Sequence, residues 1–312
     1  MNIAFMGTPN ISKEILEKIY EKNKDNIKLV VTKEDKIRSR GKKKKATEVK
    51  EFALKHDIDV LTPKVIDKEF LEEFKKYNID LVIVVAYGKI LPKEFLDIPK
   101  VGCFNIHFSL LPKYRGASPI QSAILNGEKL TGVNIIKMNE KMDEGDIIFS
   151  KNINIEEIDG TKEIFEKALD IVKENINKII EDIENGKVEY VKQNGEAIYC
   201  GKISKDMTSL DFSQDVEKLN NMVRAFNMEY GAKTSVFGFN VKIWKSKIKK
   251  DVQNIQIENG KILIEDKNIY IKAKNGFLEI LELQPESKGK MKNTDFCNGY
   301  MHKIDKNNVK IV

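Results

Sequence analysis

The sequence contains few of the residues that build disulfide or metal frameworks. Its 312 residues include only three cysteines and three histidines. Cys103, Cys200 and Cys297 lie far apart, which is typical neither of a disulfide framework nor of closely spaced zinc ligands. We therefore expect no metal cofactor and a chain suited to the reducing cytoplasm.

Long apolar runs are also missing. No run approaches the ~20 apolar residues that span a membrane, and the opening residues MNIAFMGTPN lack the length and charge of a signal peptide. Hydrophobic residues make up 41% and charged residues 33% of the chain, the balance of a soluble globular protein. We expect a cytoplasmic monomer that does not bind membranes.

The net charge of +6 is small, but it is unevenly distributed. The C-terminal part, residues 207–312, carries +5 of it. A second basic segment, KIRSRGKKKK at residues 36–45, has seven basic residues in ten. Together these segments could bind a polyanion such as a nucleic acid. A solvated surface explains charge alone equally well, so both interpretations stay open here.

Short apolar runs alternate with amphipathic stretches in the first part of the chain. Strands are predicted at residues 2–7, 27–32, 80–88 and 102–107, and two more at 131–138 and 145–155. Helical spacing of apolar residues predicts helices at residues 12–22 and 47–57, a short helix at 120–127 and a long helix over 161–186. This alternation favours an α/β, Rossmann-like domain over residues 1–186, a parallel sheet with helices on both faces.

The pattern changes after Gly186. Residues 187–206 are polar with weak periodicity, which indicates a linker. Residues 207–312 contain one helix pattern and then several short strand-like runs separated by turns such as ENG and KNG. This order predicts a C-terminal β-barrel, OB-like in size and strand number.

The stretch GCFNIHFSLLPKYRGASPIQ, residues 102–121, places two polar residues in an apolar strand. Asn105 and His107 are two apart, so they share one face at the carboxyl end of a parallel strand, where open α/β sheets bind ligands. An amide can donate to an oxygen that becomes negative, and an imidazole can transfer a proton near neutral pH. Two buried structural residues would give the same pattern.

A carboxylate in a later loop could complete such a group. The stretch NEKMDEGDII contains Asp143 between two predicted strands. A carboxylate beside His107 would orient the ring and favour its charged form. The same residues also fit an ordinary turn.

Residues NIHFSLLPKYRGASPIQ, together with MDEGDI, resemble the formyltransferases that use 10-formyltetrahydrofolate. The resemblance implies that Asn105, His107 and Asp143 are catalytic. It also implies a folate-binding site for the donor co-substrate. The residues expected there are Ser109, Leu110, Leu111 and Pro112, with Ala86, Tyr87 and Gly88.

Further stretches extend this resemblance over nearly the whole chain. FMGTP, VVAYGKILP, YCGKISKDMTSLDF, MVRAFN, VKIWKS and LELQPESKGKM are similar to the branch of the family that formylates initiator methionyl-tRNA for translation initiation. That branch implies transfer of the formyl group to the α-amine of methionine, with the C-terminal domain binding tRNA. It further implies tRNA-binding roles for Arg40, Lys42, Lys43, Lys44 and Lys45.

The sequence departs from the family pattern at a few positions. Phe108 replaces the usual Gly, and Glu144 stands where Thr is common. Three other functions remain open at this point: a sugar N-formyltransferase, a formyltetrahydrofolate hydrolase, and a folate- or RNA-binding module without catalysis. The last of these leaves the grouping of Asn105, His107 and Asp143 unexplained.

Overall fold

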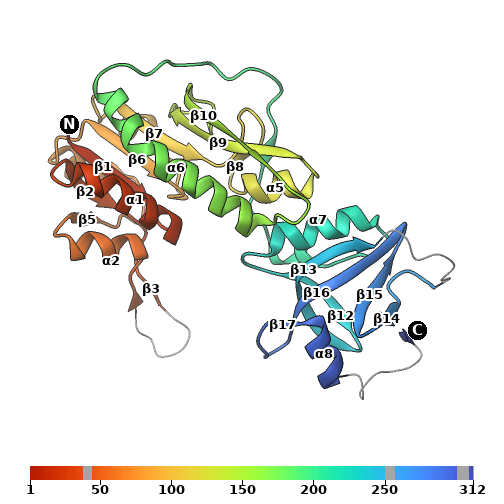
Figure 1. Ribbon diagram of the computed structural model, residues 1–312. Coiled ribbons are helices and arrows are strands. Elements are labelled where there is room, and N and C mark those ends of the chain that lie inside the picture. The colour runs from red at the N-terminus through yellow and green to blue at the C-terminus, as the bar shows by residue number, and fades with distance from the viewer. Residues whose placement is uncertain (38–43, 250–256, 301–308, 312) are drawn as a thin grey trace. The chain divides into compact units, whose positions relative to one another are not determined.

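The computed structural model describes residues 1–37, 44–249, 257–300 and 309–311 (Figure 1). The chain divides into two compact units. Unit 1 contains Met1–Pro119, Thr131–Ile153 and Glu166–Cys200, and unit 2 contains Ile120–Leu130, Asn154–Phe165 and Gly201–Val312.

A seven-stranded sheet forms the centre of unit 1. In spatial order its strands are β10 (Ile147–Asn154), β9 (Leu130–Lys137), β7 (Gly102–His107), β6 (Leu81–Val85), β1 (Ile3–Gly7), β2 (Ile27–Val31) and β5 (Asp59–Leu61).

Five neighbouring strands of this sheet, from β5 to β7, are parallel, which confirms the α/β prediction. Strand β9 differs, because it pairs antiparallel with β7. From β1 the chain first builds outward through β2 and β5 and then returns to place β6 on the other side of β1. The order therefore reverses between β1 and β6, and ligands of open α/β sheets bind at the carboxyl ends of the strands beside such a point.

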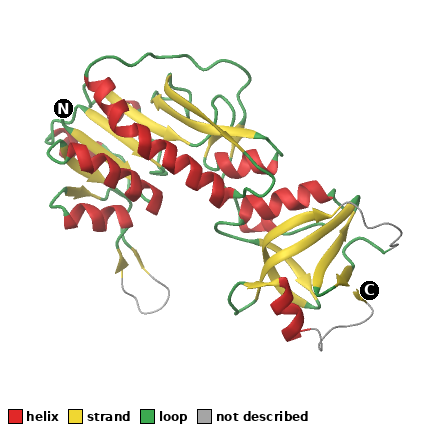
Figure 2. Cartoon of the chain, viewed as in Figure 1, coloured by secondary structure: helices red, strands yellow, loops and turns green. Residues whose placement is uncertain are grey.

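Helices cover this sheet (Figure 2). They are α1 (Asn10–Asn23), α2 (Glu48–Lys55), α3 (Lys68–Lys75), α4 (Lys93–Leu96) and most of α6 (Thr161–Glu184), whereas α5 (Pro119–Leu125) belongs to unit 2 from Ile120 onward. Met6 and Val84 belong to the apolar cluster that also holds Phe74 of α3 and Phe95 of α4. Their strand neighbours Phe5 and Ile83 point the other way and are buried too. Both sheet faces are thus covered, as predicted.

Two small ladders lie outside the main sheet. Strand β8 (Arg115–Gly116) pairs in parallel with β11 (Tyr199–Cys200), and β3 (Lys36–Ile37) pairs antiparallel with β4 (Lys44–Lys45). Strand β11 of the first ladder falls within residues 187–206, the segment expected to be a linker. Val191 also forms an antiparallel bridge with Ile147. Because these contacts join residues far apart in sequence, local periodicity gave no sign of them.

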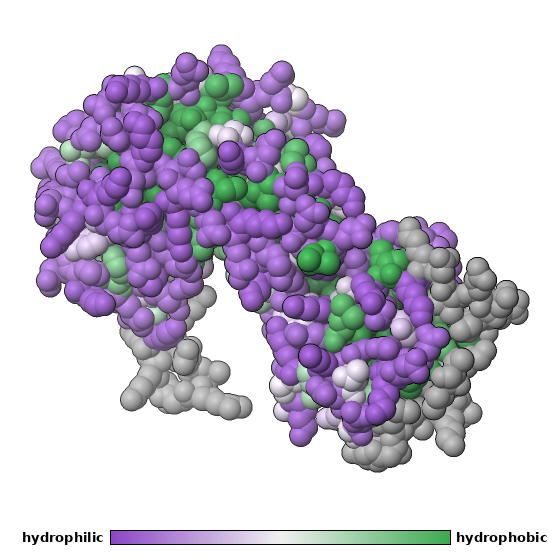
Figure 3. All heavy atoms as spheres, in the orientation of Figure 1, coloured by the Kyte–Doolittle hydropathy of each residue, from purple (hydrophilic) through white to green (hydrophobic). Residues whose placement is uncertain are grey.

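Unit 2 is built on an antiparallel sheet, with β18 as a parallel addition. Its elements are η1 (Lys205–Thr208), α7 (Val216–Phe226), β12 (Ala232–Val236), β13 (Phe239–Lys249), β14 (Ile262–Glu265), β15 (Asn268–Ala273), β16 (Gly276–Pro285), β17 (Met291–Lys292), α8 (Asn293–Tyr300) and β18 (Val309–Ile311). Its apolar core joins Leu219 of α7 and Phe296 of α8 to inward-facing strand residues such as Ile243. Hydrophilic residues cover most of the visible surface (Figure 3).

Candidate active site

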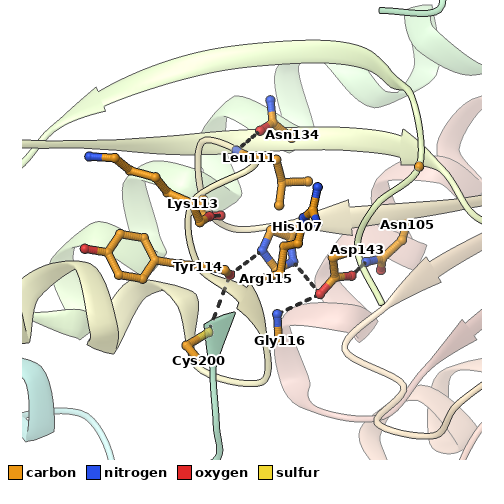
Figure 4. Close-up of polar contacts among 12 residues, drawn as sticks. Asn105, His107, Leu111, Lys113, Tyr114, Arg115, Gly116, Asn134, Asp143 and Cys200 are labelled. Carbon is orange, nitrogen blue, oxygen red and sulfur yellow. Dashed lines mark hydrogen bonds and ion pairs between the residues drawn. The ribbon is translucent and has the colours of Figure 1, made fainter. Parts of the chain in front are cut away.

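Asn105, His107 and Asp143 come together at the carboxyl end of β7 (Figure 4). Asn105 Nδ2 donates to Asp143 Oδ1 at 3.3 Å, and His107 Nδ1 lies 3.7 Å from Asp143 Oδ2. Asn105 and His107 share a strand face, whereas Asp143 enters from the loop between β9 and β10. An amide, an imidazole and a carboxylate therefore meet in one place, where proton transfer and oxygen stabilisation can both occur.

The hydrogen bond of His107 fixes its tautomer. Nε2 lies 2.9 Å from the carbonyl oxygen of Tyr114. A carbonyl only accepts hydrogen bonds, so Nε2 carries the proton and donates it. In the neutral ring, Nδ1 then presents a lone pair toward Asp143. The ring is 5% exposed.

Two effects oppose each other at His107. Burial lowers its pKa below the ordinary value, and this effect is larger than the upward pull of the Asp143 charge and of the Tyr114 carbonyl. The neutral ring therefore predominates at neutral pH, with Nδ1 able to accept a proton. The imidazolium that results is stabilised by the carboxylate beside it.

Asp143 is held by the backbone around it. Its own φ is +53°, in the left-handed region that few residues other than glycine occupy. Gly116 N donates to Asp143 Oδ2 at 2.8 Å. A Cβ at Gly116 would lie 2.1 Å from the Cys200 carbonyl oxygen, and one at Gly145 would lie 1.8 Å from the Lys137 carbonyl oxygen. The carboxylate is thus positioned by two backbone segments that admit only glycine at their closest approach.

The predicted folate residues 109–112 form a loop fastened at several points. Ser109 Oγ donates to the Lys113 carbonyl at 2.6 Å, and Leu111 N donates to Asn134 Oδ1 at 2.6 Å. Leu110 and Pro112 keep partly exposed side chains. Asn134 is buried opposite His107 in the β7–β9 register. Asn134 is visible in the sequence as a single amide inside an apolar strand, but we did not predict from it that Asn134 would hold the loop at Leu111.

The other predicted folate residues follow β6, next to β7. Ala86 and Gly88 are exposed and have positive φ angles of +46° and +73°. Tyr87 points into the core, 1% exposed. Its hydroxyl has no hydrogen-bond partner in the part of the chain that the structure describes, and burial raises its pKa to about 12. At this strand end the backbone, not the phenol, faces outward.

A second group of polar side chains, which we did not predict from the sequence, lies beside Asn105, His107 and Asp143. Arg115, 9% exposed, lies 2.8 Å from Glu144 through Nη1 and Oε1. Tyr199 OH donates to the same Glu144 oxygen at 2.9 Å. Gln193 Oε1 accepts from Arg115 Nε at 3.1 Å and from Nη2 at 2.7 Å. Glu144, noted as a departure from the family pattern, is therefore the partner of a buried arginine.

The predicted tRNA-binding residues are covered only in part. Arg40, Lys42 and Lys43 lie outside the described residues. The backbone of Lys44 belongs to β4. Lys45 is exposed, with Nζ 2.7 Å from Glu48 Oε1. Their role in binding stays a prediction.

The described residues form neither a cluster of metal ligands nor a membrane-spanning helix. Among these, no group of three or more His, Cys, Asp or Glu side chains is arranged to hold a metal ion. Within the same ranges, no helix has the length and apolar character needed to cross a membrane.

Comparison with family models defines the class. A model described as formyl transferase matches residues 1–180, and one described as formyl transferase, C-terminal domain, matches residues 202–301. The chain therefore belongs to the formyltransferase family.

Individual members of the family show which proteins this chain is similar to. The chain is 40% identical to the methionyl-tRNA formyltransferase of Caldicellulosiruptor saccharolyticus, over 99% of both chains. It is 38% identical to that of Clostridioides difficile, over 96% of this chain and 97% of the relative. A solved N-formyltransferase from Helicobacter canadensis, in complex with folinic acid and dTDP-3-aminofucose, superposes with a TM-score of 0.68. It is 24% identical over 93% of this chain and 100% of that chain, a likeness of fold alone.

Proposed function

We propose that this enzyme transfers the formyl group of 10-formyltetrahydrofolate to the α-amine of methionine on initiator methionyl-tRNA. The observation that carries the proposal is the meeting of a neutral His107, the Asn105 amide and the Asp143 carboxylate at the end of β7. The identity of 40% over 99% of a methionyl-tRNA formyltransferase supports this acceptor.

The geometry suits a transfer between two nitrogens. Asn105 uses one amide hydrogen toward Asp143 and keeps a second to donate to the formyl oxygen, which becomes negative as the amine attacks. His107 Nδ1 takes the proton that the attacking amine loses, and Asp143 stabilises the imidazolium. The proton then passes to the nitrogen N10 of the donor as its bond to the formyl carbon breaks. No proton is gained or lost overall.

The donor needs a surface at the same sheet edge. The exposed Ala86 and Gly88 backbone after β6 and the partly exposed Leu110 and Pro112 after β7 supply one. Ser109, Leu111 and Tyr87 are buried, so in this proposal they set the shape of the two loops. No side chain larger than the Ala86 methyl group projects from the two exposed positions after β6, which fits the approach of a flat pterin ring.

We also propose a division of labour along the chain. Residues 1–186 form the catalytic domain, 187–206 connect the domains and 207–312 bind tRNA, consistent with the ranges of the two family models. Arg40 and Lys42, Lys43, Lys44 and Lys45 contact tRNA phosphates. The enzyme acts as a monomer in the cytoplasm.

An acceptor panel tests the function. Purified enzyme is given 10-formyltetrahydrofolate with radiolabelled formyl, and then methionyl initiator tRNA, a dTDP-linked amino sugar or buffer alone. We expect label in the tRNA fraction only. Label in the sugar would instead make the protein a sugar N-formyltransferase, and loss of formyl from the donor in buffer alone would make it a hydrolase.

A further inference from the structure

Gln193 joins the two backbone segments that hold the catalytic residues. Its Nε2 donates to the carbonyl oxygens of Asp143 at 2.7 Å and Gly145 at 2.9 Å. Its Oε1 accepts twice from Arg115. An amide has two donor hydrogens and two lone pairs, so every hydrogen-bonding position of Gln193 is used.

Each segment matters for a different catalytic group. Arg115 lies between Tyr114, whose carbonyl accepts from His107 Nε2, and Gly116, whose N–H donates to Asp143 Oδ2. On the other side, Gln193 holds the carbonyl of Asp143 itself, at the residue with a φ of +53°. A left-handed φ at a non-glycine residue persists where the surroundings enforce it, and Gln193 is one such constraint.

Arg115, which anchors one end of Gln193, is itself held by several contacts. Glu144 and Tyr199 both contact the guanidinium, through Nη1 at 2.8 Å and 3.1 Å. Because Tyr199 pairs with Arg115 in the β8–β11 ladder, the anchor is tied by main-chain bonds as well. Glu144 follows Asp143 in the chain, so its contact with Arg115 is a second tie between the turn and the anchor. Loss of the Gln193 contacts would therefore displace the Asp143 backbone, while the ladder keeps Arg115 in place.

We propose that Gln193 is a positioning residue for this reaction, acting through the distance between Asp143 and His107. This inference rests on the proposed function for the choice of reaction. It assigns a task to residues 191–200 beyond connecting two domains: they hold the Asp143 turn against the segment that orients His107. An error of about 1 Å in such a position can cost 10²-fold in rate.

The variant Gln193→Glu tests this with little change of shape. It replaces both donor hydrogens by a carboxylate oxygen that repels the carbonyls of Asp143 and Gly145, while contact with Arg115 is kept. We expect kcat to fall by about 10-fold to 10²-fold while KM for both substrates changes little. Asn194→Asp, an equal charge change at the exposed neighbouring residue, should retain wild-type kcat.

The pH profile separates positioning from simple support of the fold. The Asp143 carboxylate is the charged group that faces the His107 ring and raises its pKa. Gln193→Met removes both contacts without adding a charge that would itself raise the pKa of His107. If the Asp143 carboxylate moves away in this variant, the acid limb of kcat/KM shifts to lower pH. A lower kcat with an unmoved acid limb would overturn the proposal. Gln193→Met also measures the loss in kcat if Gln193→Glu does not fold.

A double-mutant cycle with Asp143→Asn completes the test. A residue that acts through Asp143 loses its effect once the carboxylate is gone, so Gln193→Glu should cost little in the Asp143→Asn background. Losses that multiply would overturn the proposal. The cycle uses whichever acceptor the wild-type enzyme formylates. A wild type that does not formylate methionyl-tRNA therefore refutes the proposed function, whereas the cycle tests the positioning role of Gln193 separately.

Discussion

A 2.9 Å hydrogen bond joins His107 Nε2 to the backbone carbonyl of Tyr114, and it determines which ring nitrogen can take a proton. The proton on Nε2 leaves Nδ1 free, 3.7 Å from Asp143 Oδ2. That distance is too long for a direct hydrogen bond. The carboxylate therefore acts on the ring through its charge, while the carbonyl fixes the tautomer.

Asp143→Asn should slow formyl transfer and move its pH dependence. The carboxylate raises the pKa of His107 against the larger effect of burial. Without it the pKa falls further, so the ring stays neutral to lower pH and the acid limb of kcat/KM moves toward acid. The imidazolium formed during transfer is also less stable, and we expect a loss of about 10²-fold, the scale of general acid–base catalysis.

The measurement is the pH–rate profile of both enzymes on one acceptor, so that ionisation of the substrate amine is common to both. Asn tolerates the left-handed φ at residue 143, so near-ultraviolet circular dichroism should match the wild type. An acid limb at the same pH in both enzymes would contradict a charge effect of Asp143 on His107.

Gly116→Ala should destabilise the enzyme. Its φ of +123° is unfavourable for a side chain, and the new Cβ would lie 2.1 Å from the Cys200 carbonyl oxygen. We expect the free energy of unfolding to fall by about 1–3 kcal/mol from the backbone strain, more with the clash. Gly289→Ala is the matched control, because a Cβ there has no described atom within 4 Å. Urea denaturation measures both, and equal midpoints would count against the close approach of β8 and β11.

Replacing Lys42, Lys43, Lys44 and Lys45 by Ala should weaken tRNA binding and flatten its salt dependence. Each lost phosphate contact reduces the slope of log K against log salt by about 0.9 on duplex or 0.7 on single strands. KM for the folate donor should hardly change. Replacing Lys18, Lys75, Lys76 and Lys178, which lie on helices of unit 1 or directly after one, makes an equal change in net charge. If tRNA affinity depends on salt with the same slope in the wild type and in the variant at residues 42–45, these lysines form only a solvated surface.

Local pattern predicted the parts of the structure that local sequence determines. Strands β1, β6 and β7, which end at Gly7, Val85 and His107, could be predicted from their apolar runs, because each strand is buried on both faces. Helix α3 was not predicted, although Phe70 and Phe74 at a spacing of four give a helical signal. The sequence also indicated the meeting of Asn105 with His107, since i and i+2 share a strand face.

The contacts that support the catalytic residues could not be predicted from local sequence pattern. Gln193 contacts Asp143 and Arg115, residues 50 and 78 positions away along the chain. The β8–β11 ladder has two residues per strand, too short for any periodicity. The segment that holds Gln193 and β11 is polar because its side chains bind other polar groups, and the same composition is typical of a linker. Only the three-dimensional arrangement distinguishes the two.

The central claim is that Asn105 and His107 carry out formyl transfer to methionyl-tRNA. Single-turnover transfer of radiolabelled formyl from 10-formyltetrahydrofolate to methionyl initiator tRNA tests it most directly, with wild type, His107→Ala and Asn105→Ala measured side by side. We predict rapid transfer by the wild type and a loss of at least ~10²-fold in each variant, the scale of one acid–base or oxyanion-stabilising group. Transfer within a few-fold of wild type in either folded variant would contradict the account.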